Sequence, residues 1–244
     1  MDSSIRDVLM SLEKSRIEIL GLERDFLELI KRYDVRGRKK NYSQSLSDRL
    51  AKKLVADLNI SFPGLLAGET KAGGHAGPVK VDVRLHTPLG MTLGISIKTI
   101  NFRDLTTGRF TKNVVRNDKE LRAESSEVHQ YQPYAVLAGL VLLPNEARAD
   151  AKLGRSSFAH AIDKFRHRVG RTDPSRDHQL FELLYVGTYS LNADDFGAIS
   201  LHDASIYRGG DELPPVVGWQ EFLEAIKTTY EIRHRVIVPR PKRL

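Results

Sequence analysis

The sequence predicts an α/β domain with a mixed central sheet flanked by helices, preceded by a helical arm. Three observations support this class. Segments with the apolar spacing of helices alternate with short segments that have the period of two, or the continuous apolar character, of strands. The chain of 244 residues, 41% of them hydrophobic, can bury a substantial core. No repeat, low-complexity segment or break in composition divides residues 41–244 into two domains.

The N-terminal residues 1–40 are expected to form the helical arm. Apolar or aromatic residues recur every seven positions, at Ile5, Leu12, Ile19, Phe26 and Tyr33. A second series with the same period includes Val8, Leu22 and Leu29, which together is the spacing of a coiled-coil seam. Two interpretations follow: an arm that pairs with a second copy or a partner protein, or an amphipathic helix that lies on its own domain.

Helices and strands are then expected in alternation. Residues 45–58 carry leucines at four-residue spacing, and residues 156–169 and 219–230 also have helical apolar patterns. Residues 79–85 and 91–100 alternate as strands do, and residues 137–143 are continuously apolar, which is typical of a buried strand. Residues 181–189 and a short segment near 199–207 complete the expected strands, and the last strand and helix form a C-terminal extension.

The hairpin predicted over residues 79–101 carries a carboxylate on one strand and an ammonium group on the next. Asp82 lies on the first strand, Thr87-Pro88-Leu89-Gly90 forms the turn, and Ser96-Ile97-Lys98 lies on the second strand. A carboxylate can hold a divalent metal, and a lysine can orient or help to deprotonate an attacking water. The alternative is a surface hairpin with a cross-strand ion pair.

Asp82 followed by Ser96-Ile97-Lys98 resembles the PD-(D/E)xK nuclease superfamily, which has the fold of restriction endonucleases. In that pattern an acidic residue precedes the lysine by two positions, and here Ser96 takes its place. Some restriction enzymes of the superfamily also have Ser-x-Lys and supply a glutamate from the following helix. The resemblance covers residues 45–190 and implies a restriction-endonuclease-like sheet, with Mg²⁺ (or Mn²⁺) bound by Asp82 and by the carbonyl of Ile97.

An acidic helix is expected next, over residues 117–134. On a helix, Glu120, Glu124 and Glu127 fall within one arc of about 120° that also includes Gln130, Tyr131 and Tyr134. By the resemblance, Glu124 is the first candidate for the missing metal ligand, followed by Glu127 and Glu120. Gln130-x-x-x-Tyr134 resembles an element of RecB-type nucleases, which implies that Gln130 orients the site or the substrate. The alternative is a solvated acidic face.

Glu69 is a further candidate metal ligand, because members of the superfamily often carry a glutamate near the first strand or helix. It precedes a Gly-rich segment whose glycine spacing fits neither a P-loop nor a dinucleotide fingerprint. The alternative for Glu69 is an ordinary polar residue at the end of a strand.

The charge of the chain favours a nucleic-acid partner. There are 38 Lys and Arg against 31 Asp and Glu, which gives a net charge of +7 and a pI near 9.5. The loop that follows the predicted catalytic strand and a second basic cluster supply the expected DNA-binding residues: Arg103, Arg109, Lys112, Arg116, Arg166 and Arg168. The alternative is a mildly basic protein with scattered charge.

The absence of cysteine excludes disulfides, thiolate metal sites and a thiol nucleophile. No apolar run has the length of a membrane span, and the first residues lack a signal-peptide pattern, so a cytoplasmic protein is expected.

The sequence as a whole predicts an Mg²⁺-dependent endonuclease that cuts double-stranded DNA, as a type II restriction enzyme or a related defence nuclease. A homodimer is expected, because two sites are needed to cut both strands. The alternative is an inactive or partner-licensed nuclease-fold subunit that binds DNA within a defence complex.

Overall fold

The protein is described from a computed structural model that covers residues 39–68, 81–104, 106–151, 153–190, 192, 195, 197–210 and 212–236. The predicted helical arm up to residue 38, the Gly-rich segment and Glu69 lie outside these residues.

A mixed seven-stranded sheet forms the centre of the described part, and its strands follow one another in chain order. The strands are β1 (Leu66–Ala67), β2 (Val83–Thr87), β3 (Gly90–Thr99), β4 (Val136–Pro144), β5 (Leu183–Tyr189), β6 (Ile199–Asp203) and β7 (Val216–Val217). The pairs β3–β4 and β4–β5 are parallel, and the four other pairs are antiparallel. All nine residues of β4 are buried, as expected for a strand covered on both faces.

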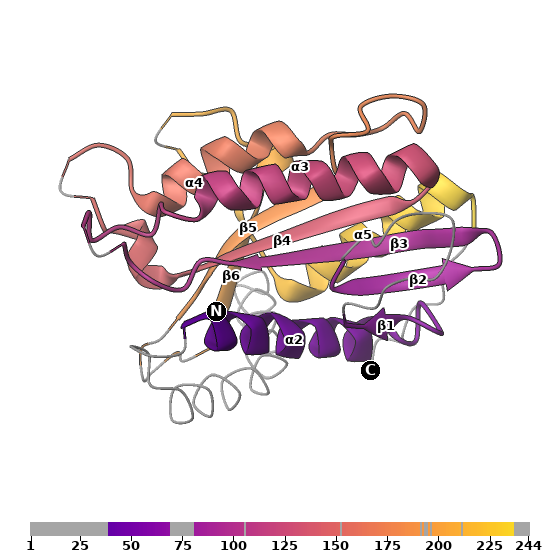
Figure 1. The fold of residues 1–244 in the computed structure, drawn as a ribbon, viewed down its shortest axis with the longest axis horizontal. Coiled ribbons are helices and arrows are strands. Elements are labelled where there is room, and N and C mark those ends of the chain that lie inside the picture. The colour runs from indigo at the N-terminus through magenta and orange to yellow at the C-terminus, as the bar shows by residue number, and fades with distance from the viewer. Residues whose placement is uncertain are drawn as a thin grey trace, which may run out of the picture.

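Helices cover both faces of the sheet (Figure 1). Helices α2 (Lys39–Leu58) and α5 (Trp219–His234) pack with Val83, Ile95 and Ile97 in one core. Helices α3 (Val114–Tyr131) and α4 (Ser157–Phe165) pack on the opposite face in a second core. Short 3₁₀ helices η1 (Asn145–Arg148), η2 (Arg166–Arg168) and η3 (Ala204–Ile206) join these elements. The predicted α/β class, with a mixed sheet between helices, is confirmed.

Several predicted boundaries are wrong by a few residues. The helix expected over residues 117–134 begins at Val114 and ends at Tyr131, two residues before Pro133, which cannot continue a helix. The helix expected over residues 156–169 changes to 3₁₀ geometry after Phe165, and the strand expected over residues 199–207 ends at Asp203. The first strand of the hairpin begins at Val83 rather than at residue 79.

None of the helices that the structure describes is long and apolar enough to cross a membrane.

Candidate active site

Asp82 lies directly before β2 and is held against β3. Its backbone N–H donates to the Ile95 carbonyl at 3.0 Å, and its Oδ2 accepts the Ile97 N–H at 2.6 Å. These two bonds fix the position of the backbone and of the carboxylate at the same time. Ile97, expected as a metal ligand through its carbonyl, thus contacts Asp82 through its N–H.

Ser96 and Lys98 extend from β3 toward α3. Alternation along a strand sends successive side chains to opposite faces, and Ile95 and Ile97 pack into the core with α2 and α5. Ser96 and Lys98 therefore share the other face, where Ser96 is fully buried. The helix α3 covers this face, so the candidate residues on β3 lie under the acidic helix.

Helix α3 brings two glutamates to Lys98. The Lys98 Nζ lies 2.6 Å from Glu124 Oε1 and 3.6 Å from Glu120 Oε2, and Arg116 Nε contacts the other Glu120 oxygen at 3.0 Å. The Lys98 and Glu124 side chains are only 15% and 14% exposed. The predicted convergence of one strand and one helix is therefore a feature of the structure.

Burial and charge act in opposite directions on this pair. Burial alone would lower the pKa of Lys98, but Glu124, Asp82 and Glu120 together raise it above the ordinary value. Burial raises the pKa of Glu124 by more than the neighbouring ammonium group lowers it. Lys98 is consequently a cation at neutral pH, and Glu124 is a carboxyl group whose charge depends on a partner.

Ser96 lies beside Glu124 at this centre: Ser96 Oγ and Glu124 Oε2 are both buried, and a side-chain hydrogen bond between the two residues opposes the rise in the pKa of Glu124. Glu124 thus directs Oε1 to Lys98, and its second oxygen is available to Ser96 or to a bound cation. Buried carboxylates are paired with cations or coordinate metals, so the second oxygen of Glu124 is a place where a cation fits. Within the described residues no group of three or more His, Cys, Asp or Glu side chains forms a metal site, but Mg²⁺ usually needs only one or two carboxylates and water.

The other acidic candidates are placed differently. Glu127 lies one turn beyond Glu124 and is half-buried. Glu69 is not among the described residues.

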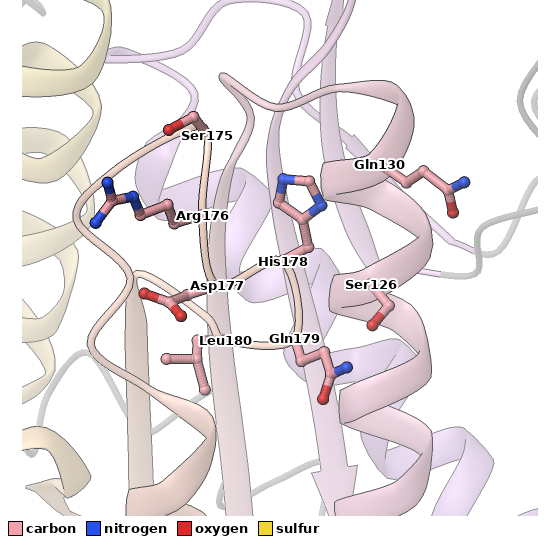
Figure 2. Close-up of a pocket in the computed structure, with 8 residues that line it drawn as sticks. All are labelled: Ser126, Gln130, Ser175, Arg176, Asp177, His178, Gln179 and Leu180. Carbon is pink, nitrogen blue, oxygen red and sulfur yellow. The ribbon is translucent and has the colours of Figure 1, made fainter.

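Gln130 lies away from this centre. It is exposed, and with Ser126 it lines a hollow of about 620 Å³ whose other wall is the loop formed by residues 175–180 (Figure 2). Successive helix residues turn by about 100°, so Gln130 and Glu124 lie on different flanks of α3. Tyr134 lies beyond the end of the helix and is 64% exposed, so the expectation that one helical arc carries all these residues is wrong.

The loop after β3 uses its basic residues mainly within itself. Arg103 Nη1 donates to the Gly108 carbonyl at 2.9 Å, and its guanidinium lies 4.8 Å from the Phe110 ring. Lys112 contacts Asp104 at 3.4 Å, and Arg109 donates to the carbonyl of Arg155. Arg116, with a side chain that is 68% exposed, is the predicted DNA-binding residue of this region nearest to Lys98 through its bond to Glu120.

The second basic cluster is bound to acidic partners. Arg168 Nε lies 2.7 Å from Asp118 Oδ1, and Asp118 on α3 has a side chain only 6% exposed. Arg166 Nε lies 3.1 Å from Asp163 and close to the Tyr207 ring. Arg168 therefore fastens η2 to α3, a structural role that the sequence analysis did not assign to it.

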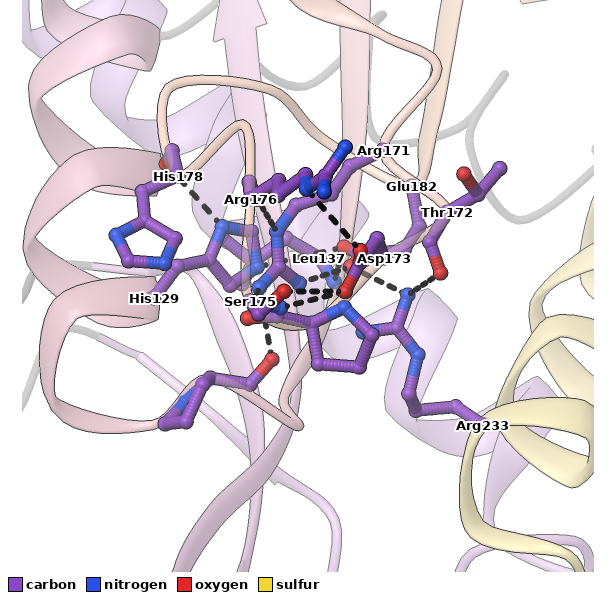
Figure 3. A network of polar contacts seen from close by, with 12 residues as sticks. His129, Leu137, Arg171, Thr172, Asp173, Ser175, Arg176, His178, Glu182 and Arg233 are labelled. Atoms are coloured by element: carbon purple, nitrogen blue, oxygen red, sulfur yellow. Dashed lines mark hydrogen bonds and ion pairs between the residues drawn. The ribbon is translucent and has the colours of Figure 1, made fainter.

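A buried network around Glu182 was not foreseen (Figure 3). Glu182 accepts from Arg171 Nη1 at 2.7 Å and from the Leu137 N–H at 2.8 Å, and Arg233 of α5 approaches it to 3.1 Å. His129 of α3 lies 3.4 Å from the same carboxylate. Its members are far apart in the chain and follow no period, so no sequence signal could have joined them.

The network also holds the loop before β5. Arg171 donates to the carbonyls of Pro133, Pro174 and Arg176. His129 Nδ1 contacts the carbonyl of His178 at 3.2 Å. The backbone carbonyls of this loop thus face the buried side chains of Arg171 and His129.

No protein-family model, curated protein or solved structure matches the chain. What the site can do is therefore inferred from its own residues.

Proposed function

We propose that the chain is a metal-dependent nuclease that hydrolyses DNA phosphodiester bonds. One observation carries the proposal. Lys98 lies under an acidic helix, and the carboxylates of Asp82 and Glu124 reach the same buried ammonium group from the start of β2 and from α3.

The order of the elements supports a restriction-endonuclease-like fold. A helix, three strands, a helix and a strand follow one another as α2, β1, β2, β3, α3 and β4. Asp82 directly precedes the second strand of this series, Ser96 and Lys98 lie on the third strand, and Glu124 lies on the second helix, which is the order that the PD-(D/E)xK resemblance implies. Glu124 takes the place that Ser96 leaves without charge.

Asp82 and Glu124 would hold Mg²⁺, with Ser96 beside them and Mn²⁺ as a substitute. A bound divalent ion would supply a Lewis acid for the phosphate oxygen and the leaving oxygen. Asp82 is suited to this task because its bond to the Ile97 N–H fixes its carboxylate before any ligand arrives.

Lys98 would orient the attacking water and offset the negative charge that develops on the phosphate. Its raised pKa keeps it protonated at neutral pH, so it acts as a cation and a hydrogen-bond donor rather than as a general base. Glu124 and Glu120 hold the ammonium group in place from α3.

The test is cleavage of supercoiled plasmid by the purified protein with Mg²⁺, Mn²⁺ or EDTA, for wild type and Lys98→Ala. We expect nicked or linear DNA that requires a metal, and a loss of at least about 100-fold in the variant. Equal cleavage by both proteins would overturn the assignment.

A protein that binds DNA but never cuts it would point to the second function, a DNA-binding or partner-licensed subunit of a larger complex. Light scattering would show whether the chain forms the homodimer expected for cutting both strands of a duplex.

A further inference from the structure

We propose that Tyr131 is a stacking platform for an unpaired nucleobase, and that the DNA strand leaving the candidate active site is single-stranded there. The inference rests on the proposed function and names its substrate class.

The flank of α3 that faces Lys98 leads to Tyr131. Glu120 and Glu124 identify this flank, because both reach Lys98. Tyr131 follows Glu124 by seven residues, which is about two turns, so both side chains leave the helix within about 20° of each other. The separation along the helix axis is about 10 Å.

Tyr131 is exposed at the end of the helix. It is the last residue of α3, and its side chain is 52% exposed. The next side chain, Gln132, lies against Gly90, where an added Cβ would come within 2.4 Å of it. The end of α3 therefore lies over the turn between β2 and β3, as the ribbon also shows (Figure 1). Leu89 of that turn is 90% exposed.

Strand β2 runs in the same direction as this flank. Helix α3 returns the chain from β3 to the parallel strand β4, and β2 is antiparallel to β3, so α3 and β2 point the same way. Val83 and Leu85 face α2, which leaves Arg84 and His86 on the side of α3. Strand β2 thus leads from Asp82 to His86, and α3 leads in the same direction from Glu124 to Tyr131.

This chemistry suits a single strand. An exposed aromatic ring binds a nucleobase by stacking. Bases within a duplex are already stacked on each other, so the ring favours an unpaired one. The roughly 10 Å along the helix axis places the stacked base a few nucleotides from the scissile phosphate.

The experiment measures binding without cleavage. In EDTA, fluorescence anisotropy compares a labelled single-stranded oligonucleotide with its duplex, for wild type, Tyr131→Phe and Tyr131→Leu. We expect Tyr131→Leu to weaken single-strand binding about 5- to 100-fold, Tyr131→Phe to stay within about twofold of wild type, and duplex binding to change little. Because Tyr131 is half-exposed, both variants are expected to fold, which circular dichroism checks.

An abasic site moved along the oligonucleotide gives the second readout. One position should weaken binding by wild type but not by Tyr131→Leu, since the variant has already lost the stack. Equal single-strand affinity of wild type and Tyr131→Leu, or a preference for the duplex, would overturn the inference and leave the nuclease proposal standing. If Tyr131→Leu weakens single-strand binding but wild type shows no metal-dependent cleavage, the stacking inference stands and the nuclease proposal fails.

Discussion

Lys98 and Glu124 depend on each other for their charge. The ammonium group contacts one oxygen of a carboxyl group whose pKa burial raises, and the two atoms lie 2.6 Å apart. At the scale of the residue, the pair is therefore both the candidate catalytic centre and a buried ion pair. Removing either partner lowers the free energy of unfolding, because the other group then remains buried without its counter-charge.

Replacement of Lys98 by methionine removes the cation and keeps most of the side-chain volume. Glu124 is then buried without its cation, so its pKa rises further and its ionisation opposes folding. A group with a raised folded-state pKa loses stability as the pH rises. We expect the variant to be destabilised by about 2–3 kcal/mol at pH 7.5 and by less at pH 5, measured by urea unfolding. Adding Glu124→Gln should remove the pH dependence, and a destabilisation independent of pH would contradict this account.

Asp82 is expected to contribute charge rather than shape. In Asp82→Asn the side-chain oxygen still accepts the Ile97 N–H, so the fold is kept while the negative charge is lost. Calorimetric titration with Mn²⁺ should show at least about a tenfold loss of affinity, as is common when a metal site loses a ligand or its support. Glu146→Gln, which neutralises an exposed carboxylate of η1, is the matched control and should bind Mn²⁺ as wild type does.

At the scale of the element, α3 is the helix that joins the site to the rest of the fold. One flank of α3 carries Glu120 and Glu124 to Lys98. The inner face of the same helix is held to η2 by the ion pair between Asp118 and Arg168. The position of the candidate ligands thus depends on an ion pair that takes no part in the chemistry.

Two arginines predicted to bind DNA should separate into two roles. Arg168→Ala leaves Asp118 buried without its nearest cation, and we expect a loss of about 2–3 kcal/mol in the free energy of unfolding, with little effect on DNA affinity. Arg116→Ala removes an exposed side chain, so unfolding should change by less than about 0.5 kcal/mol. In the same variant, the slope of the logarithm of DNA affinity against the logarithm of salt concentration should fall by about one, because one phosphate contact is lost. The opposite pattern would show that Arg168 contacts DNA.

At the scale of the whole molecule, buried titratable groups join the layers. Glu182 connects β5 with α5 through Arg233 and with the backbone of β4 through Leu137. On the other side of the sheet centre, His202 of β6 contacts Arg148 through Nε2 at 2.8 Å and the Pro214 carbonyl through Nδ1 at 2.6 Å. The ring therefore carries its proton on Nδ1 and presents an unprotonated nitrogen to the guanidinium.

Acid should destabilise the protein in two stages. Burial and the charge of Arg148 lower the pKa of His202, so its contribution is present above its ordinary value of 6.5 and is lost as the pH falls. Burial would raise the pKa of Glu182, but His129, the Leu137 N–H and Arg171 lower it overall, so its contribution is lost below its ordinary value of 4.5.

The measurement is urea unfolding of wild type and Glu182→Gln across this range. The variant should be about 3 kcal/mol less stable at pH 7, and the difference should narrow below pH 4.5. Parallel curves down to pH 3 would show that the charge of Glu182 contributes nothing.

The class of fold and the strand pair that carries the candidate site follow from the sequence alone, because both depend on periodicity. The alternation around Asp82 and Lys98 predicts two adjacent strands, and the structure pairs β2 with β3 there. Helical spacing also predicts an acidic helix after them. Its two ends lie three residues before the predicted ones, because the residues that end a helix, such as Pro133, leave no trace in the apolar period.

Which polar residues meet depends on how the elements pack in three dimensions. The fold turned Glu124 toward Lys98 and Gln130 toward another loop, because the packing of Leu121 and Val128 in the core sets the rotation of α3. It also brought Arg171, Glu182 and Arg233 together from three separate elements. Periodicity records which face of an element is buried, whereas contacts between distant polar groups depend on how the elements dock, which no local pattern contains.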